Sequence, residues 1–284
     1  ADLQELLLQA AMDAGAQLLL HARVNGIEEA AGRVRMMGRG FDALDADGAI
    51  AADGVWSALR AHVVVDGPAQ PSGHIAYRAL IDAARTPVRL RCDDVNLWLG
   101  PSTHVVAYPV RSGEMLNVVA IVEAAARPVS QAWDEGGVAA ELLRATGAID
   151  SGLRALIDAV PSWRVWSLHD RPPLAAPQAM ARGRIALLGD AAHPMLPYLA
   201  QGAGMAIEDA AMLARGLAEA TPETVADAFA RYAQARWRRC AQVQARARRN
   251  AAIFHASGPV RWARDVAMRA VGERLLDQPW LYAR

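Results

Sequence analysis

Apolar residues recur at helical spacing near the start of the chain and again near its end. Between Asp2 and Ala14 the leucines and alanines fall on one helical stripe, and Gly15 is suited to end the last turn. A longer stripe of the same kind runs from Pro222 to His255, and another runs from Val260 to Leu276. We therefore expect a helix in each of these three stretches.

Between these helices the pattern changes to the alternation with a period of two that is typical of strands. Short strand patterns, separated by glycine-containing turns, follow the first helix and end at residue 52. Four longer ones follow residue 68, and the connections between the last three are short enough for hairpins. These four strands are expected at residues 75–81, 95–99, 104–110 and 115–122. We expect them to form an antiparallel meander.

The helix and strand alternation returns after this meander. Helical patterns at 138–146 and 151–160 lead to an apolar run at 185–188, which is typical of a strand buried on both faces. We therefore predict an α/β domain that is interrupted by an antiparallel sheet, then resumed, and followed by C-terminal helices. The predicted parts are 1–68 and 166–220 for the α/β domain, 69–165 for the sheet with its helices, and 221–284 for the C-terminal helical segment.

The composition argues against several classes of protein. With 284 residues, of which 53% are hydrophobic and 21% charged, the chain is expected to be globular. The 30 basic and 30 acidic residues cancel, which argues against a nucleic-acid-binding protein. We interpret the arginine-rich stretch 236–249 as a solvated face, with the contact of a homodimer as a further option.

The cysteines and the lengths of the apolar runs indicate in which cellular compartment the protein is expected. Cys92 and Cys240 are far apart in sequence and do not suggest a disulfide framework, which favours a reducing environment. No apolar run reaches the roughly 20 residues of a membrane-spanning helix. We expect a cytoplasmic protein without a membrane segment.

The most informative motif begins at the apolar run 185–188. Gly189 allows a close backbone approach at the end of this strand, and Asp190 presents a carboxylate where open α/β sheets bind ligands. Such a carboxylate can accept hydrogen bonds from ribose hydroxyls. The turn from Met195 to Gly204 then opens into a helix, whose first N–H groups and positive dipole end would stabilise an anion.

A second candidate site lies in the expected meander. His104 and Tyr108 are four residues apart, so on a strand both side chains point to one face. A histidine and a phenol that face one cavity could orient a phenolic substrate and remove its proton. An ordinary half-buried strand explains these two residues equally well, so the pattern alone leaves the choice open.

Two stretches resemble the motifs of class A flavin-dependent aromatic hydroxylases, the family of the salicylate, 3-hydroxybenzoate and 6-hydroxynicotinate hydroxylases. Residues 183–210, GRIALLGDAAHPMLPYLAQGAGMAIEDA, resemble the second FAD fingerprint of that family. Residues 53–60, DGVWSALR, resemble its Asp-Gly motif. The resemblance covers nearly the whole chain and implies a Rossmann-like FAD-binding domain. The Gly-rich unit with which the family begins would fall upstream of Ala1, so this domain is expected to be incomplete at its start.

The resemblance also implies roles for particular residues. The cofactor-binding residues would be Asp53, Gly54, Arg60, Gly189, Asp190, Gly202 and Ala203. The substrate would lie against Tyr77, Pro197, Tyr198 and Gln201, with His104 and Tyr108 as the catalytic residues. No metal site is predicted.

The activity implied by the resemblance is the hydroxylation of a small phenolic or hydroxylated aromatic acid. FAD would be the cofactor, NADH or NADPH the co-substrate, and O₂ the source of the oxygen atom. Three alternatives remain open from the sequence alone. The chain could be a catalytically inactive flavoprotein remnant that serves as a binding or interaction module, a flavoenzyme of another class such as a reductase or epoxidase, or a DNA-binding protein.

Overall fold

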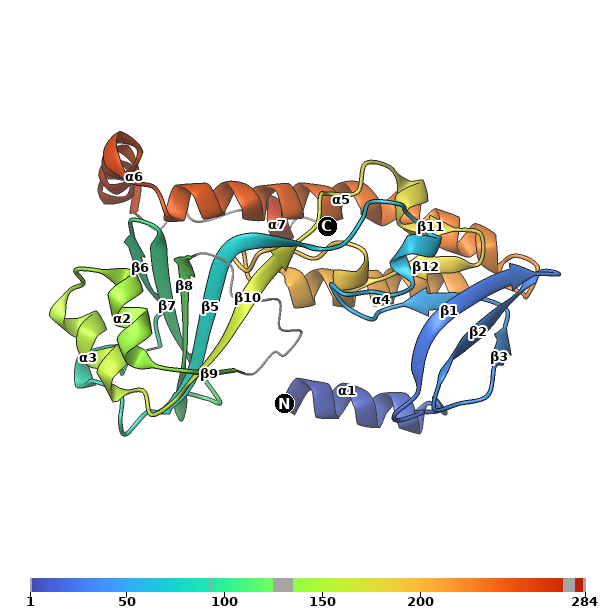
Figure 1. The fold of residues 1–284 in the computed structure, drawn as a ribbon, viewed down its shortest axis with the longest axis horizontal. Helices are drawn as coiled ribbons and strands as arrows, with labels where there is room; N and C mark the ends of the chain where they lie inside the picture. Colours follow the sequence, from blue (N-terminus) through green and yellow to red (C-terminus); the bar gives the residue numbers. More distant parts are fainter. Residues whose placement is uncertain (1, 92, 125–134, 273–278, 283–284) are drawn as a thin grey trace. The chain divides into compact units, whose positions relative to one another are not determined.

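The structure is a computed structural model that describes residues 2–91, 93–124, 135–272 and 279–282 (Figure 1). The chain divides into two compact units, each made of separate stretches of sequence. Unit 1 comprises Ala1–Gly67, Leu174–Ala192 and Ala206–Arg238, and unit 2 comprises Pro68–Pro173, His193–Met205 and Arg239–Arg284. In sequence, unit 2 therefore interrupts unit 1.

Unit 1 begins with helix α1 (Asp2–Asp13) and an antiparallel ribbon, both drawn in blue in Figure 1. The ribbon consists of β1 (Arg23–Ala30), β2 (Arg33–Arg39) and β3 (Leu44–Ala46). Strands β1 and β2 are joined by Ala31 and Gly32, whose φ angles are 52° and 74°. Positive φ at both positions is what a two-residue hairpin turn requires, because it matches the twist of the strands.

A parallel strand pair holds the two halves of unit 1 together. Strand β4 (Ala49–Ala51) lies parallel to β12 (Ile185–Leu187), which also pairs with β11 (Ala181–Arg182). The register places Ala51 beside Leu187, and the amide of Leu188 donates to the carbonyl of Ala51 at 2.9 Å. The whole antiparallel sheet lies between these strands in sequence, which confirms an α/β fold that is interrupted and resumed.

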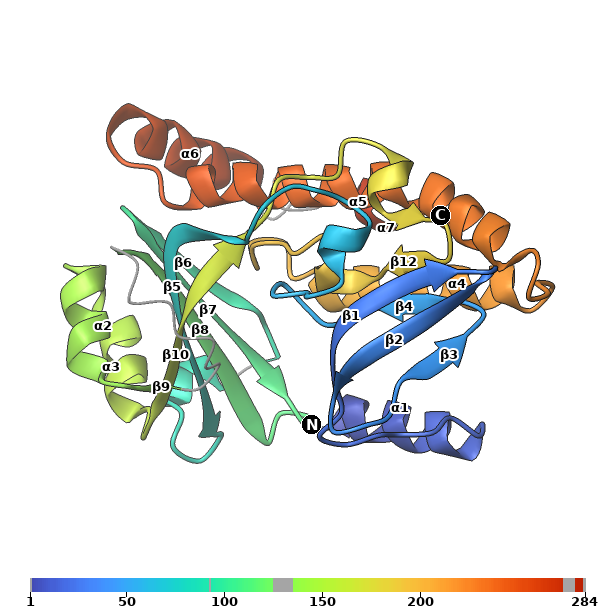
Figure 2. The ribbon, with the colours of Figure 1, turned by 45° about the vertical axis from the view of Figure 1, so that its right-hand side comes forward.

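Unit 2 is built on an antiparallel sheet with the strand order β6-β7-β8-β5-β10-β9 (Figure 2). Its strands are β5 (Gln70–Asp82), β6 (Asn96–Gly100), β7 (Thr103–Val110), β8 (Met115–Glu123), β9 (Glu135–Gly137) and β10 (Trp163–Asp170). The expected antiparallel sheet is thus present, and β6, β7 and β8 form a meander through two hairpins.

The position of β5 differs from the expectation. It does not pair with β6, the next strand in sequence, but lies between β8 and β10. No strand was expected at β10, because its alternation of apolar and polar residues is broken by two adjacent apolar residues, Val165 and Trp166. The predicted meander of four consecutive strands was therefore wrong in the position of its first strand, β5.

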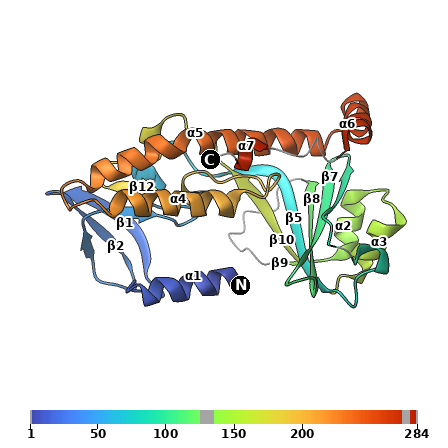
Figure 3. The same cartoon turned by 180° about the vertical axis from the view of Figure 1, so that it is seen from behind.

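The two faces of this sheet are covered by different elements. Helices α2 (Ala139–Thr146) and α3 (Ser151–Ala159) pack on one face, as Figure 3 shows from behind. The core residues Tyr77, Val105 and Ala120 belong to that face. On the other face Ala76 and Ile121 pack with residues of the 196–198 segment and of the last turns of α5 (Val225–Phe254).

The remaining helices complete both units. They are α4 (Gly202–Leu217), α6 (Gly258–Val271) and α7 (Pro279–Tyr282). The division between the units falls within α4, after Met205, and within α5, after Arg238. The last expected helix, at 260–276, includes residues 273–276, which lie outside the described residues. None of the described helices is long and apolar enough to cross a membrane.

Candidate active site

The two candidate cofactor motifs lie at the same edge of the parallel pair in unit 1. Asp53 follows the end of β4, and Asp190 follows the end of β12. Because these strands are parallel neighbours, their carboxyl ends meet, which is where open α/β sheets bind ligands. Both carboxylates belong to exposed residues. The fold therefore brings two motifs that are far apart in sequence to one polar edge.

Arg60 ties these motifs to each other. Its side chain, only 1% exposed, donates from Nη1 to the carbonyl oxygens of Ala191 and Ala192, both at 2.6 Å. Its Nε donates to Asp66 at 3.0 Å, and its Nη2 donates to the same carboxylate. The resemblance implied a contact between Arg60 and FAD. Because its guanidinium is buried and bonded within unit 1, we assign Arg60 instead the role of holding the turn that carries Asp190.

Two glycines shape this edge in different ways. Gly189 has a φ of +59°, and a Cβ there would lie 3.2 Å from the side chain of Ala206, so α4 packs directly against the turn. Gly54 has a φ of +78°, and no heavy atom lies within 4 Å of where its Cβ would be. Its backbone is thus open to a ligand. The open backbone of Gly54 fits a phosphate, and the exposed carboxylate of Asp190 fits ribose hydroxyls, which are the two polar parts of a nucleotide.

A buried ion pair fixes α4 behind this edge. Asp209 is fully buried and accepts hydrogen bonds from Arg236 Nε at 2.8 Å and from the amide of Gly189 at 3.2 Å. Arg236 also contacts Glu208 at 2.6 Å. Since a buried carboxylate needs a charged partner, Arg236 and Asp209 hold α4, α5 and the Gly189 turn as one assembly within unit 1.

The segment before α4 belongs to unit 2. Gly202 and Ala203 are the first two residues of α4, and Ala203 is exposed. Gln201, which is half-buried, accepts the first helical hydrogen bond from Met205 at 2.8 Å, and Ala200 before it has a φ of 52°. The first N–H groups of such a helix lack partners within it and favour a negative charge.

Unit 2 also contains a large, mainly apolar cavity with a volume of about 910 Å³. Strands β6, β7 and β8 form one wall, while the 197–200 segment, α5 and α6 supply much of the rest. Four of the residues expected to bind or activate the substrate line this one cavity: His104, Tyr108, Pro197 and Tyr198. Gln201 is not part of its lining, although it directly follows Ala200, which is.

Tyr77 does not join this group. It pairs with Ala120 of β8, which in turn pairs with Val105 of β7, so these three residues share one face of the sheet. His104, the neighbour of Val105 in sequence, points to the opposite face. Tyr77 is 4% exposed and packs against Trp163 in the core beneath α2 and α3. We therefore assign Tyr77 to the core and not to substrate binding.

His104 is the buried end of a chain of polar contacts. Its Nδ1 lies 2.8 Å from Nε2 of His255, and the Tyr198 hydroxyl lies 3.4 Å from the same Nε2. Nδ1 of His255 lies 3.3 Å from Oε1 of Glu123. Sequence reasoning missed His255 and Glu123, because neither is part of a motif with a characteristic spacing. The only local signal is that His255 directly follows the long α5.

Burial determines the charge of this group. It lowers the pKa of His104 to about 3, with smaller contributions from His255 and His74. It also lowers the pKa of His255 to about 4, and it raises the pKa of the Tyr198 hydroxyl. Both imidazoles and the phenol are therefore uncharged at neutral pH.

The chain is similar to known proteins in both sequence and fold. The FAD binding domain family matches residues 1–247. The chain is 35% identical to 3-hydroxybenzoate 6-hydroxylase of Polaromonas naphthalenivorans (strain CJ2), over 99% of the chain and 69% of that protein. It is 38% identical to 3-amino-4-hydroxybenzoate 2-monooxygenase of Streptomyces cremeus, over 91% of the chain and 63% of that protein. The structure of Klebsiella pneumoniae HpxO complexed with FAD and uric acid matches with a TM-score of 0.80 and 27% identity, over 96% of the chain and 68% of HpxO.

The fold, the two motifs and these matches define a flavoprotein with an FAD-binding domain. The chain belongs to the class A flavin-dependent aromatic hydroxylases. It spans between 63% and 69% of the length of the two curated relatives.

Proposed function

We propose that the protein is an FAD-dependent monooxygenase that hydroxylates a small phenolic or hydroxylated aromatic acid, with NADH or NADPH and O₂. The observation that carries the proposal is that His104 and Tyr108 line one cavity of about 910 Å³ in a chain of this family. This volume lies within the range of typical small-molecule sites. The names of both curated relatives specify a benzoate ring that bears a hydroxyl group.

The cofactor would be held by the residues that the structure leaves accessible. Asp190 would accept hydrogen bonds from ribose hydroxyls, and the backbone of Gly54 would lie against the phosphates. Asp53 would shape that turn, because its Oδ2 accepts the amide of Ala58 at 2.9 Å. The N–H groups of Gly202 and Ala203 would stabilise negative charge on the flavin ring. When bound, FAD supplies the redox chemistry, taking electrons from the nicotinamide and passing them to O₂.

The chain itself would bind and ionise the substrate. His104 would accept the proton of the ring hydroxyl, while Tyr108 would orient the ring from the same strand face. Ionisation makes the ring richer in electrons and therefore more reactive toward an electrophilic oxygen. The apolar walls, which include Leu97, Val106 and Ile121, would exclude water from the reacting atoms.

The substrate's carboxylate would be attracted by a cationic group in the lining. Arg246 of α5 lines the same cavity as His104. A guanidinium can bind a carboxylate through two parallel hydrogen bonds, which orients it as well as binding it. Arg264 also lines the cavity, but its Nη1 donates to the carbonyls of Ile253 and Phe254, so it serves the end of α5. We propose that the substrate's carboxylate lies on the side of the cavity where α5 and α6 place these two guanidinium groups.

A direct assay tests this function. The chain is mixed with FAD, and the oxidation of NADH and of NADPH is followed with 3-hydroxybenzoate, salicylate or 3-amino-4-hydroxybenzoate present. We expect at least one of these acids to stimulate oxidation and to gain one oxygen atom from isotopically labelled O₂. His104→Asn should still bind FAD but form product on the order of a hundredfold more slowly.

Two results would contradict the proposal. A protein that binds no FAD would fit the inactive remnant instead. A protein that binds FAD but oxidises the nicotinamide at a rate independent of any aromatic acid, without hydroxylated product, would be a flavin reductase of another class.

A further inference from the structure

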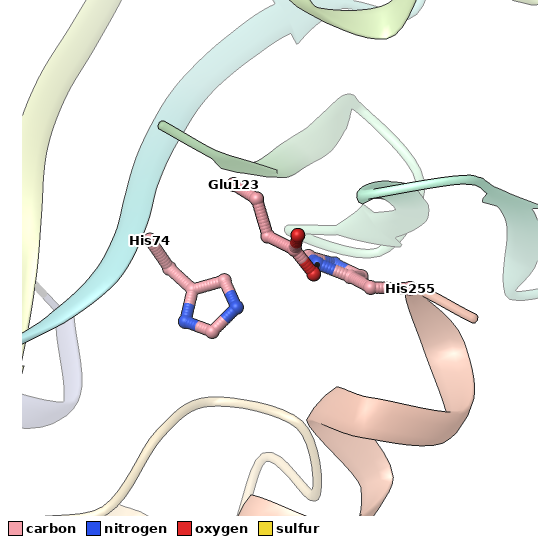
Figure 4. A group of neighbouring side chains, drawn as sticks. All are labelled: His74, Glu123 and His255. Atoms are coloured by element: carbon pink, nitrogen blue, oxygen red, sulfur yellow. Dashed lines mark hydrogen bonds and ion pairs between the residues drawn. The ribbon is translucent and has the colours of Figure 1, made fainter. Parts of the chain in front are cut away.

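Two imidazoles and one carboxylate meet at a second cavity of unit 2. His74 of β5 and Glu123 of β8 are direct partners in the register of their strands, so both side chains leave the sheet on the same face. His255, which directly follows α5, completes the group, as Figure 4 shows. One possible ligand atom from each residue lies within 4.8 Å of those of the other two. His74 and Glu123 line a cavity of about 730 Å³, which is separate from the candidate substrate cavity.

The spacing of these atoms suits a zinc ion. Nδ1 of His255 lies 3.3 Å from Oε1 of Glu123. Zn²⁺ binds imidazole nitrogens and carboxylate oxygens at about 2.0–2.2 Å in a tetrahedron, which places neighbouring ligand atoms about 3.4 Å apart. This pair therefore already has the separation of two zinc ligands. The ring of His74, whose centre is 5.2 Å from that of His255, can complete the set by rotation of its own side chain.

The imidazole of His74 is available as a ligand. Within the described residues it makes no hydrogen bond, and its Nδ1 is buried. Polar atoms that are removed from water normally have a partner, so this histidine is unusual. A bound metal ion would supply the partner that the described part of the chain does not.

The site is open to solvent and contains a negative charge. The side chain of Glu123 is 46% exposed and lines the cavity, so a fourth ligand position faces water. Two imidazoles, one carboxylate and one water form a ligand set that is common for Zn²⁺. Arg248 also lines this cavity, but its Nε donates to Asp170 at 2.6 Å, which balances its charge. The sequence did not indicate a metal site, because the three ligands are far apart in it.

His255 connects this group with the candidate substrate cavity. Without a metal, Nδ1 of His255 donates to the ionised Glu123, so its Nε2 is an acceptor. Nδ1 of His104, 2.8 Å from that Nε2, therefore donates to it. The single hydrogen of His104 is then on Nδ1, and its Nε2 keeps a lone pair. His104 lines the cavity of about 910 Å³, where this lone pair can accept a hydrogen bond from a ligand.

We propose that His74, Glu123 and His255 form a Zn²⁺ site that regulates the protein. The regulatory part of the inference rests on the proposed hydroxylase function. A metal-bound Nδ1 has no hydrogen, so the hydrogen of His255 moves to Nε2. Two N–H groups cannot face each other at 2.8 Å, so Nδ1 of His104 becomes the acceptor and Nε2 of His104 becomes the donor. The substrate cavity then contains an N–H in place of a lone pair, and His104 can no longer accept a proton from a ring hydroxyl.

The first measurement tests the site itself. The chain, with and without FAD, is dialysed against Zn²⁺, and X-ray absorption at the zinc edge, which FAD does not disturb, reports the ligands. We expect one Zn²⁺ per chain, with nitrogen and oxygen ligands at about 2.0–2.2 Å and the outer scattering of two imidazoles. A chain that binds no zinc, or zinc with a sulfur ligand, would overturn the site.

Matched variants test the ligands. His74→Gln and Glu123→Gln should each lower the affinity for Zn²⁺ by at least about a hundredfold, because loss of a partner outside the ligand shell already costs ten- to a hundredfold. His62→Gln and Glu114→Gln make the same changes at exposed positions and should leave the affinity unchanged. An equal affinity in all four variants would place the zinc elsewhere and overturn the site.

The second measurement tests the regulation. Rising Zn²⁺ should slow hydroxylation on the order of a hundredfold, with half of the effect at the Kd from dialysis, and a chelator should reverse it. His74→Gln, which leaves His104 and His255 in place, should hydroxylate at a similar rate and resist zinc. Hydroxylation that is unaffected by zinc bound at the site would overturn the regulation. A protein that hydroxylates no aromatic acid even without zinc would overturn the proposed function and the regulation, while the absorption spectrum would still decide the site.

Discussion

One buried polar group in each unit differs in its charge state. In unit 1 the buried groups are charged: Arg60 with Asp66, and Arg236 with Asp209. In unit 2 the polar group beside the candidate substrate cavity is uncharged, because burial lowers the pKa of His104 and His255 and raises that of Tyr198. The difference follows from the chemistry of the side chains. Arginine cannot lose its proton, whereas imidazole can.

The charged pairs and the neutral imidazoles suit different roles, namely fixing the backbone and accepting a proton. A buried ion pair is strongly destabilising to break, so it fixes backbone such as the turn after Asp190. A buried neutral imidazole keeps a lone pair that can accept a proton, so it can take part in chemistry. The charged pairs of unit 1 thus lie where we expect the cofactor, and the neutral His104 group of unit 2 lies where we expect the substrate to be ionised. Unit 2 buries charged residues as well, among them Asp170 and Arg264.

The largest effect is expected from breaking the charged group of unit 1. Arg60→Met leaves the Asp66 carboxylate and two carbonyls without their partner, which should destabilise the protein by about 3–5 kcal/mol. Thermal unfolding at pH 7 measures this loss. Arg35→Met is the matched control, because Arg35 pairs with Asp45 on the surface of the same unit, and its melting temperature should change much less. Equal changes would mean that burial does not distinguish the two pairs.

The neutral group of unit 2 should make the fold sensitive to acid. Above pH 6.5 His104 is neutral in the folded and unfolded states alike. Below that pH the unfolded chain takes up a proton that the folded protein refuses until its pKa of about 3, so stability falls as the pH falls. The slope from His104 is up to about 1.4 kcal/mol per pH unit. Urea unfolding between pH 7 and pH 4 should show a shallower dependence for His104→Phe, and parallel curves would contradict the neutral state.

The cofactor edge of unit 1 should respond in its affinity for FAD. Asp190→Ala removes an exposed carboxylate that we expect to bind ribose, and a hydrogen bond to a charged group contributes about 1.5–3 kcal/mol. FAD affinity, measured by fluorescence quenching, should therefore fall by about ten- to a hundredfold. Unchanged affinity would remove Asp190 from the cofactor site.

The smallest effect distinguishes the two faces of the sheet in unit 2. Tyr108→Phe removes a hydroxyl from the candidate substrate cavity, and we expect KM for the aromatic acid to rise about three- to tenfold, as the loss of one neutral hydrogen bond implies. Tyr77→Phe makes the same change in the core beneath α2 and α3, and KM should stay the same. A larger rise in KM for Tyr77→Phe than for Tyr108→Phe would place the substrate on the other face of the sheet.

The sequence could predict relations within one element but not between elements. The spacing of His104 and Tyr108 was enough to place them on one face, because the period of a strand is two. The face of Tyr77 relative to His104 depends on the pairing of β5 with β8 and of β8 with β7, which no local pattern contains. For the same reason His255, which is 151 positions from His104, could not be associated with it.

The cofactor motifs were accessible to sequence reasoning for a related reason. Gly189 and Asp190 are adjacent, and the strand before them and the helix after them are both visible in the pattern of apolar residues. The role of Arg60 was not visible, because its partners include Ala191 and Ala192, which it contacts through their backbone carbonyls. Every residue has a backbone carbonyl. The residue type therefore does not show which carbonyl accepts a hydrogen bond from a given side chain.

The parallel pairing of β4 with β12 has a consequence for biosynthesis. The ribosome finishes β4 at Ala51 long before it adds Ile185, the first residue of the partner strand. At about 5–20 residues per second, that interval is on the order of ten seconds. During this time β4 lacks β12, the strand with which it pairs, so the newly made chain should depend on chaperones more than its size alone would suggest.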